Sequence, residues 1–186
     1  MVHIAHIISD LDTGGAEVML AKLVGGMDRA RFSSTVISLT DRGQLGEQIE
    51  SLGVAVHTLG MRRGWPDILA LPRLIRLLKT LNPTIVQSWL YHADLLSTLA
   101  VKFFGLPILV WNLRCSDMDL KRYRPLTRWV QWVLAQWSAA PAAVVVNSLA
   151  GQVLHQRLKF LAALVVFLLH YPVSGTRYIV STFPMR

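Results

Sequence analysis

The sequence lacks several features that mark particular classes of protein. It contains a single cysteine, Cys115, so no intrachain disulfide can form, which is compatible with a reducing compartment. Only 16% of its 186 residues are charged while 53% are hydrophobic, a balance that argues against intrinsic disorder. At this length the chain has the size of one ordinary domain and can bury its own core.

Long hydrophobic runs are missing as well. The longest one, FLAALVVFLL from Phe160 to Leu169, is shorter than the ~18 apolar residues that a membrane-spanning helix needs. The first residues, MVHIAHIISDLD, lack the basic start of a secretory signal and reach acidic residues early. These absences predict a cytoplasmic protein, which could also contact the inner face of a membrane.

Acidic residues are scarce relative to basic ones. The 19 lysines and arginines against 11 aspartates and glutamates give a net charge of +8, which favours anionic partners such as phosphorylated ligands or anionic lipid. The excess could equally be a solvated surface that keeps the protein soluble. The sequence has no nucleic-acid-binding module, zinc-ligand spacing, GxSxG elbow or P-loop, so we expect no nucleic-acid partner, no metal and no cofactor.

What the sequence does contain is a regular alternation of short apolar segments with amphipathic ones. This order predicts an α/β fold: a Rossmann-like doubly wound parallel sheet with helices on both faces. Pro72 is expected to kink or split the third helix. The predicted strands cover residues 2–9, 33–39, 54–60, 84–89, 107–113 and 143–148. The predicted helices begin at residue 16 and cover 43–53, 65–83, 92–105, 124–140 and 149–158.

Residues 159–186 break this alternation. The segment KFLAALVVFLLHYPVSGTRYIVSTFPMR contains no acidic residue and no longer follows the strand–helix rhythm. It could form a last helix and strand, or it could be sequence that did not evolve with the rest. We therefore expect one domain over residues 1–158 and an apolar tail over 159–186 whose structure the pattern does not specify.

Two glycines follow the first predicted strand. In an open parallel sheet, ligands bind at the carboxyl ends of the strands, so the residues there are candidates for a site. Without side chains, Gly14 and Gly15 could let their backbone N–H groups approach a phosphate, and the helix that follows would add the positive end of its dipole. A tight turn alone would also explain the pair, which is not part of a GxGxxG fingerprint.

Polar side chains follow the fourth and fifth strands. His92 could hydrogen-bond a sugar or phosphate or transfer a proton near neutral pH, or it could simply be satisfied by backbone or solvent. Arg114, two residues after Asn112, could make a bidentate phosphate contact or a salt bridge to a nearby aspartate. Asp94 is expected to favour the dipole at a helix start, and Cys115 to be a bystander.

The segment KRYRPLTRWVQWVLAQW places basic residues beside tryptophans. This combination suits docking on an anionic membrane, although a helix packed on the sheet with a basic leading end would have the same pattern. The residues predicted for peripheral membrane contact are Lys121, Arg122, Arg124, Arg128, Trp129 and Trp132.

Four stretches, in the same order, resemble a known family. HIISDLDTGGAEVMLAKLV, ESLGVAVHTLG, PTIVQSWLYHADLLSTLAVKFFGLPILVWNLR and AAVVVNSLAGQ together resemble the N-terminal half of the retaining glycosyltransferases of family four, which have the GT-B architecture. The similarity covers about residues 3–158. It implies a Rossmann-like domain that faces a second one across a cleft, with the acceptor held mainly by the N-terminal half and the nucleotide-sugar by the C-terminal half.

The resemblance also implies roles for the candidate residues. Gly14 and Gly15 would lie in the loop that approaches the donor's diphosphate and sugar, and His92 on the cleft wall near the acceptor, where it would orient a hydroxyl. Many members have a histidine after the fifth strand that contacts the transferred sugar. Arg114 stands at about that place here, close to Asn112, and would add positive charge.

The family continues with a VIPNG-like linker and a donor domain with paired glutamates, and neither is in this sequence. We therefore predict the acceptor-side domain of a glycosyltransferase of polysaccharide biosynthesis, truncated or frameshifted near residue 158. Its reaction would be hexosyl transfer from a nucleotide-sugar to a glycan or lipid-linked acceptor, weak or absent in this chain alone. The alternative is a non-catalytic, membrane-docking and acceptor-binding subunit that pairs with a separate donor-binding chain. A flavodoxin-like module is disfavoured because no loop suits a particular cofactor.

Overall fold

The computed structural model of the protein describes residues 1–62, 67–105, 108–114, 125–158, 160, 164–168 and 179–182. Strands and helices alternate along the chain up to residue 157, as the sequence predicts. The strands are β1 (Val2–Ile8), β2 (Phe32–Ser38), β3 (Ala55–Thr58), β4 (Ile85–Trp89), β5 (Ile108–Leu113), β6 (Ala143–Val146), β7 (Leu164–Leu168) and β8 (Ile179–Thr182). The helices are α1 (Gly15–Gly26), α2 (Gly43–Ser51), α3 (Ala70–Leu81), α4 (Tyr91–Phe104), α5 (Pro125–Gln136) and α6 (Leu149–Arg157).

The described strands form one sheet in the order β3-β2-β1-β4-β5-β6-β7-β8. The pairs from β3 through to β7 are parallel, and β8 pairs antiparallel with β7. The strand order reverses between β1 and β4, and open α/β sheets bind ligands at such a switch point. The predicted doubly wound, Rossmann-like sheet is confirmed.

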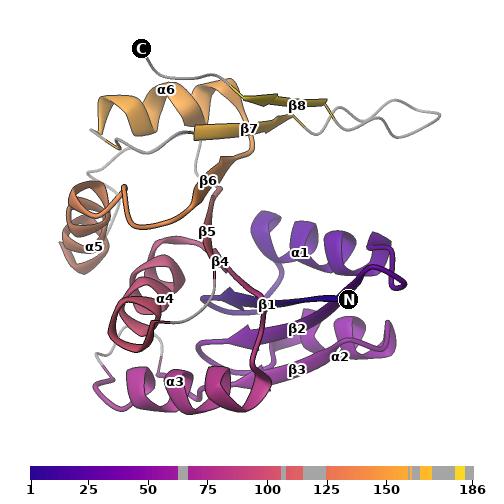
Figure 1. Cartoon of the computed structure of the whole chain (residues 1–186). Helices are drawn as coiled ribbons and strands as arrows, with labels where there is room; N and C mark the ends of the chain where they lie inside the picture. Colours follow the sequence, from indigo (N-terminus) through magenta and orange to yellow (C-terminus); the bar gives the residue numbers. More distant parts are fainter. Residues whose placement is uncertain are drawn as a thin grey trace.

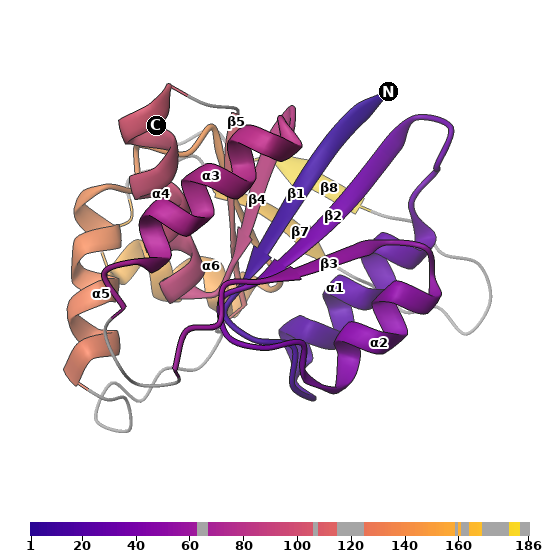
Figure 2. The same ribbon diagram turned by 90° about the horizontal axis from the view of Figure 1, so that it is seen from below.

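Helices cover both faces of the sheet. Helices α1 and α2 lie on one side, here called the α1 face, and α3, α4 and α5 lie on the other, here called the α4 face (Figure 1, Figure 2). Helix α6 also belongs to the α4 face, because its His155 hydrogen-bonds Tyr91 of α4. Each face has its own buried apolar cluster. Members of the two clusters are Ile8, Leu20, Val24, Ile49 and Trp89 on the α1 face, and Ile7, Leu78, Trp111, Leu134 and Phe160 on the α4 face.

Gly53 ends α2 as the sequence predicts, whereas the predicted effect of Pro72 on α3 is wrong. Gly53 closes α2 as expected, with φ +76° and its N–H donating to the Glu50 carbonyl. Pro72 does not kink or split α3, because the helix begins at Ala70 and runs unbroken to Leu81. Proline is tolerated in the first turn, where its missing N–H removes no helical hydrogen bond.

The tail contributes to the same sheet. Where the sequence left open a last helix and strand, the described part of 159–186 contains β7, parallel to β6, and β8 beside it. These strands extend the sheet at the edge opposite β3. The domain boundary at residue 158 stays a prediction.

Candidate functional site

The carboxyl ends of the central strands bring four of the five predicted site residues to one edge of the sheet. Gly14 immediately precedes α1 and Gly15 is its first residue, Asn112 is the penultimate residue of β5, and Arg114 comes directly after that strand. The α1 helix packs on the face that also carries Trp89, the last residue of β4. We call this set the strand-end site.

Within the glycine pair, Gly15 is the open position. Gly14 has extended backbone, and a Cβ added to it would lie 2.3 Å from the Glu17 carboxylate, so a larger residue would push that carboxylate aside. A Cβ added to Gly15 would meet no atom within 4 Å, and Gly15 is exposed as the first residue of α1. The first N–H groups of a helix have no partner within it, and the first turn of α1 also carries the Glu17 carboxylate.

The loop before the glycines is braced by the next strand–helix loop. The Thr13 hydroxyl donates to the Gln44 side chain at 2.7 Å, and the Leu45 N–H donates to the Leu11 carbonyl at 3.0 Å. Gly43 has φ +52°, and a Cβ there would lie 2.3 Å from the Leu11 carbonyl oxygen, so this close approach requires glycine. These contacts with the loop before α2 fix the position of the loop before α1.

Arg114 is a cation held against an aromatic ring. Its guanidinium carbon lies 4.7 Å from the ring centre of Trp89, which is fully buried, and the cross-strand neighbour of Trp89 is the buried Asn112. Burial lowers the pKa of the Arg114 guanidinium to about 10, so the group remains protonated at neutral pH. A cation over the face of an indole ring is stabilised by the ring's electron density.

Several buried polar atoms at this edge have no hydrogen-bond partner in the described part of the chain. Leaving such an atom unpaired costs about 1–3 kcal/mol, and most buried polar groups in proteins are therefore paired. Because these atoms come from the ends of β1, β2, β4, β5 and β6, they favour this edge as the place where a polar ligand binds. The atoms are Ser9 Oγ, Ser38 Oγ, Trp89 Nε1, Asn112 Oδ1, Arg114 Nε and Asn147 Oδ1.

His92 contacts α5 instead of the other predicted site residues. It is the second residue of α4, half-buried, and its Nε2 lies 3.4 Å from the Thr127 hydroxyl of α5. Burial lowers the pKa of its imidazole, which favours the neutral ring. The structure thus places His92 on the α4 side of the edge, apart from the Arg114–Trp89 pair, in contact with α5.

The expectation that Asp94 lies at a helix start is confirmed, and its effect on the α4 dipole stays a prediction. Asp94 does lie in the first turn of α4, but it is fully buried, and burial raises the pKa of its carboxyl well above the usual range. The Ser88 hydroxyl donates to its Oδ1 at 2.6 Å. A raised pKa disfavours the charged form, so burial works against a favourable interaction with the dipole.

The sequence did not predict a buried hydrogen-bond network that joins α4, α5 and α6. His155 Nδ1 lies 2.7 Å from the Gly151 carbonyl, so Nδ1 donates and Nε2 accepts from the Tyr91 hydroxyl at 2.8 Å. Gln131 of α5 donates to the same hydroxyl at 3.4 Å. The network ties α4, α5 and α6 together, and its two bonds between helices join residues 40 and 64 apart in the chain, so no local pattern could reveal them.

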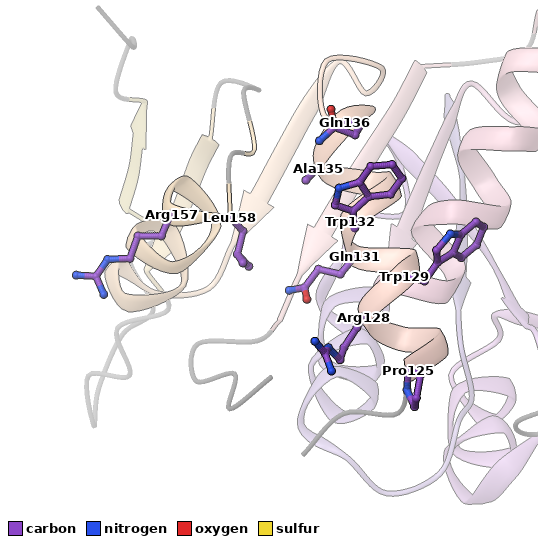
Figure 3. A pocket seen from close by; sticks show the side chains of 9 residues that line it. All are labelled: Pro125, Arg128, Trp129, Gln131, Trp132, Ala135, Gln136, Arg157 and Leu158. Carbon is purple, nitrogen blue, oxygen red and sulfur yellow. The ribbon is translucent and has the colours of Figure 1, made fainter. Parts of the chain in front are cut away.

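Helix α5 exposes two large aromatic side chains. Trp129 is 55% exposed and Trp132 62% exposed, and both line a hollow of about 720 Å³ with Arg128 and with Arg157 of α6 (Figure 3). In Figure 3 the two tryptophans extend from one side of α5, while Arg128 and Gln131 extend from the side nearer α6. Lys121, Arg122 and Arg124, predicted for the same surface, lie outside the described residues, as do Cys115 and the nearby aspartates.

Two features missing from the described residues bear on membrane and metal binding. Among the described helices, none combines the length and apolar character required to span a bilayer. In the same part of the chain, no group of three or more His, Cys, Asp or Glu side chains gathers where it could hold a metal ion.

The fold is a Rossmann-like α/β domain whose strand-end site gathers a glycine pair, a cation and unpartnered polar atoms at one edge of the sheet. Comparison with known proteins identifies the family: the model of Glycosyltransferase Family 4 matches residues 13–166, most of the chain. The protein therefore belongs to glycosyltransferase family 4.

Individual relatives agree with this assignment. The capsular polysaccharide biosynthesis glycosyltransferase CapH of Staphylococcus aureus is 28% identical over 89 residues, which cover 47% of this chain and 24% of CapH. The structure of HepE from Anabaena in complex with UDP superimposes with a TM-score of 0.67 at 16% identity, over 89% of this chain and 44% of HepE.

A further solved structure shows the same fold. MurG of Acinetobacter baumannii gives a TM-score of 0.57 at 14% identity, over 80% of this chain and 42% of MurG. At these identities the structural comparisons show the fold alone. The chain spans less than half the length of these solved structures and about a quarter of CapH.

Proposed function

We propose that this chain supplies the acceptor-side wall of a glycosyltransferase cleft, for hexosyl transfer from a nucleotide-sugar to a glycan or lipid-linked acceptor. The observation that carries the proposal is the strand-end site, where the open Gly15, the Arg114 cation and several unpartnered buried polar atoms lie at one edge of the sheet. Family membership supports the class of reaction.

The proposed chemistry is positioning and charge stabilisation. When a nucleotide-sugar reacts, the bond from the sugar to the diphosphate breaks and negative charge grows on the leaving phosphate. Backbone N–H groups at the start of α1 and the Arg114 guanidinium would stabilise that charge, while Asn112 would hydrogen-bond the sugar. His92, favouring its neutral form, would orient an acceptor hydroxyl.

The chain alone is proposed to have little or no transferase activity, because it spans under half of its solved relatives and a cleft needs two walls. The anion site can still be tested directly with inorganic pyrophosphate as the probe. Isothermal titration of the 186-residue chain should show binding that weakens as salt concentration rises.

The matched variants are Gly15→Ala and Gly26→Ala, at the two ends of α1. A Cβ at either position meets no atom within 4 Å, so both variants should fold and both should gain a little helix stability. Gly15→Ala should weaken pyrophosphate binding about tenfold by blocking close approach to the backbone, the size expected when a charged hydrogen bond is lost. Gly26→Ala should bind like wild type. Equal affinities in all three proteins would contradict the proposed anion site.

We also propose that α5 rests on an anionic bilayer. The exposure of Trp129 and Trp132 beside Arg128 and Arg157 favours this occupant, since interfacial tryptophans insert at the headgroup level and arginines pair with anionic lipid. The chain should sediment with phosphatidylglycerol vesicles, not with phosphatidylcholine vesicles, and less so at high salt. Replacing both tryptophans with serine should abolish sedimentation, whereas Phe103→Ser, at an exposed aromatic on α4, should not. Retained binding by the double variant would overturn this docking surface.

A further inference from the structure

Trp89 is arranged as a rigid platform under Arg114. The indole is fully buried in the α1-face cluster, and the tilted ring of His6 lies 6.4 Å away, centre to centre. Arg114 crosses its face with a guanidinium-to-centre distance of 4.7 Å. Arginine side chains have many rotamers, so a guanidinium fixed in one place is an arrangement that the platform has to stabilise.

Arg114 also has capacity left for a ligand. Its buried Nε has no hydrogen-bond partner in the described part of the chain, and it forms no ion pair with a described residue. A guanidinium that has lost part of its water gains more from an incoming anion than a fully hydrated one. The neighbouring Asn112 adds an unpartnered acceptor on the same side of the sheet, which suits a hydroxyl donor and not the anion.

We propose that Trp89 is a positioning residue for Arg114: its indole face holds the guanidinium at the carboxyl edge of the sheet, on the α1 face, where Arg114 binds a diphosphate. The inference rests on the proposed function, because it assumes that Arg114 contacts the anion. In this role Trp89 acts through Arg114, with its indole face against the guanidinium.

The contact between the Arg114 guanidinium and the Trp89 ring can be measured without any ligand. In the ¹H–¹⁵N spectrum of the chain, the ring current of Trp89 should move the Arg114 Nε–H resonance upfield of the other arginines, and Arg114→Lys identifies the peak. The shift should shrink in Trp89→Phe and persist in Trp111→Phe. Trp111 is the matched control, because it is equally buried but packs on the α4 face against Phe160.

A double-mutant cycle then tests the role with inorganic pyrophosphate as the probe. Arg114→Gln should weaken binding about tenfold, as expected for a lost charged hydrogen bond. Trp89→Leu should weaken it about fivefold in the wild-type background, within the range of cation–π interactions, and have no effect in the Arg114→Gln background. Trp89→Phe should bind more weakly than wild type by about twofold, since phenylalanine is the poorer cation–π partner, and Trp111→Phe should bind normally.

The possible outcomes separate the two proposals. Losses that multiply independently in the double variant, or an Arg114 resonance without an upfield shift, would overturn the positioning role while leaving the anion site intact. Unchanged binding by Arg114→Gln, together with a loss in Gly15→Ala, would remove Arg114 from the site and with it the role of Trp89. If Trp89→Leu does not fold, the comparison of Trp89→Phe with Trp111→Phe decides, and equal affinities would overturn the inference.

Discussion

Two buried tryptophans on neighbouring strands show how the two faces of the sheet differ. Trp111 of β5 faces α4 and donates its indole N–H to the Thr98 hydroxyl at 3.0 Å. Trp89 of β4 faces α1, and its indole N–H has no partner in the described part of the chain. Both are fully buried, so burial alone does not separate them. The difference lies in whether the protein itself satisfies the polar atom.

The same contrast extends along each face. On the α4 face the buried hydroxyls and imidazole of Ser88, Tyr91, Thr98 and His155 have partners, although Asp94 Oδ2 and Ser97 Oγ do not. On the α1 face most of the unpartnered atoms lie at the strand ends, while His6 Nδ1 lies within β1. The α4 face therefore satisfies most of its buried polar groups, and we propose that the end of the α1 face keeps hydrogen-bonding capacity for a ligand.

The largest expected effect comes from His6, on the α1 face. Burial lowers the pKa of its imidazole from 6.5 to about 3. Between these values the unfolded chain takes up a proton and the folded chain does not, so stability is full above about pH 6.5 and falls as the pH drops. From about pH 7 to about pH 4, His6 should remove about 3 kcal/mol of the free energy of unfolding.

Urea denaturation of wild type and His6→Gln at both pH values measures this contribution. The variant should lose less stability on acidification than wild type does. The buried Asp94 acts in the opposite direction, because its raised pKa favours the folded state at low pH, but it is common to both proteins. Parallel pH profiles would mean that His6 does not control the acid response.

Tyr91→Phe tests the α4 face, where most buried polar groups have hydrogen-bond partners. Removing the hydroxyl leaves His155 Nε2 and the Gln131 amide without this partner, so the free energy of unfolding should fall by about 1–3 kcal/mol. Pyrophosphate affinity should not change, because the network lies on the α4 face. A variant with normal stability and weakened binding would reverse the assignment of the two faces.

Leu90 is where the chain crosses from one face to the other, between Trp89 and Tyr91. Its φ of +72° and ψ of 151° belong to a region that glycine occupies readily and leucine does not. Leu90→Gly should therefore be more stable than Leu90→Ala by about 1–2 kcal/mol, the reverse of the usual order. Chemical denaturation of the pair isolates the strain, because both variants lose the same side-chain packing.

Asn112→Leu should have the smallest effect on stability. Its buried Oδ1 has no partner to lose, so an apolar side chain of similar size should change the free energy of unfolding by less than about 1 kcal/mol, in either direction. Pyrophosphate affinity should not change, because Asn112 is proposed to hydrogen-bond the sugar and its unpartnered Oδ1 is an acceptor. A large loss of stability would show that Asn112 has a structural role and does not belong with the unpartnered group.

Much of the fold could be predicted from local patterns. The alternation of apolar and amphipathic segments predicted the order of strands and helices, and Gly53 marked the end of α2. Pro72 was misjudged because its effect depends on where α3 begins, which the sequence did not specify. Gly14, Gly15, Asn112 and Arg114 of the candidate site could be found because they lie at or after the ends of predicted strands. The sequence does not distinguish Trp89 from other apolar strand residues.

The sequence by itself determined the parallel α/β architecture, the glycine pair before α1 and the positive charge of the chain, because each depends on composition or on periodicity over a few residues. Only the tertiary structure decided which buried polar atoms have partners. Trp89 meets Arg114 25 residues further along the chain, and Tyr91 meets His155 64 residues away. Such pairs form because packing of the sheet and helices brings distant segments together, and no local pattern specifies them.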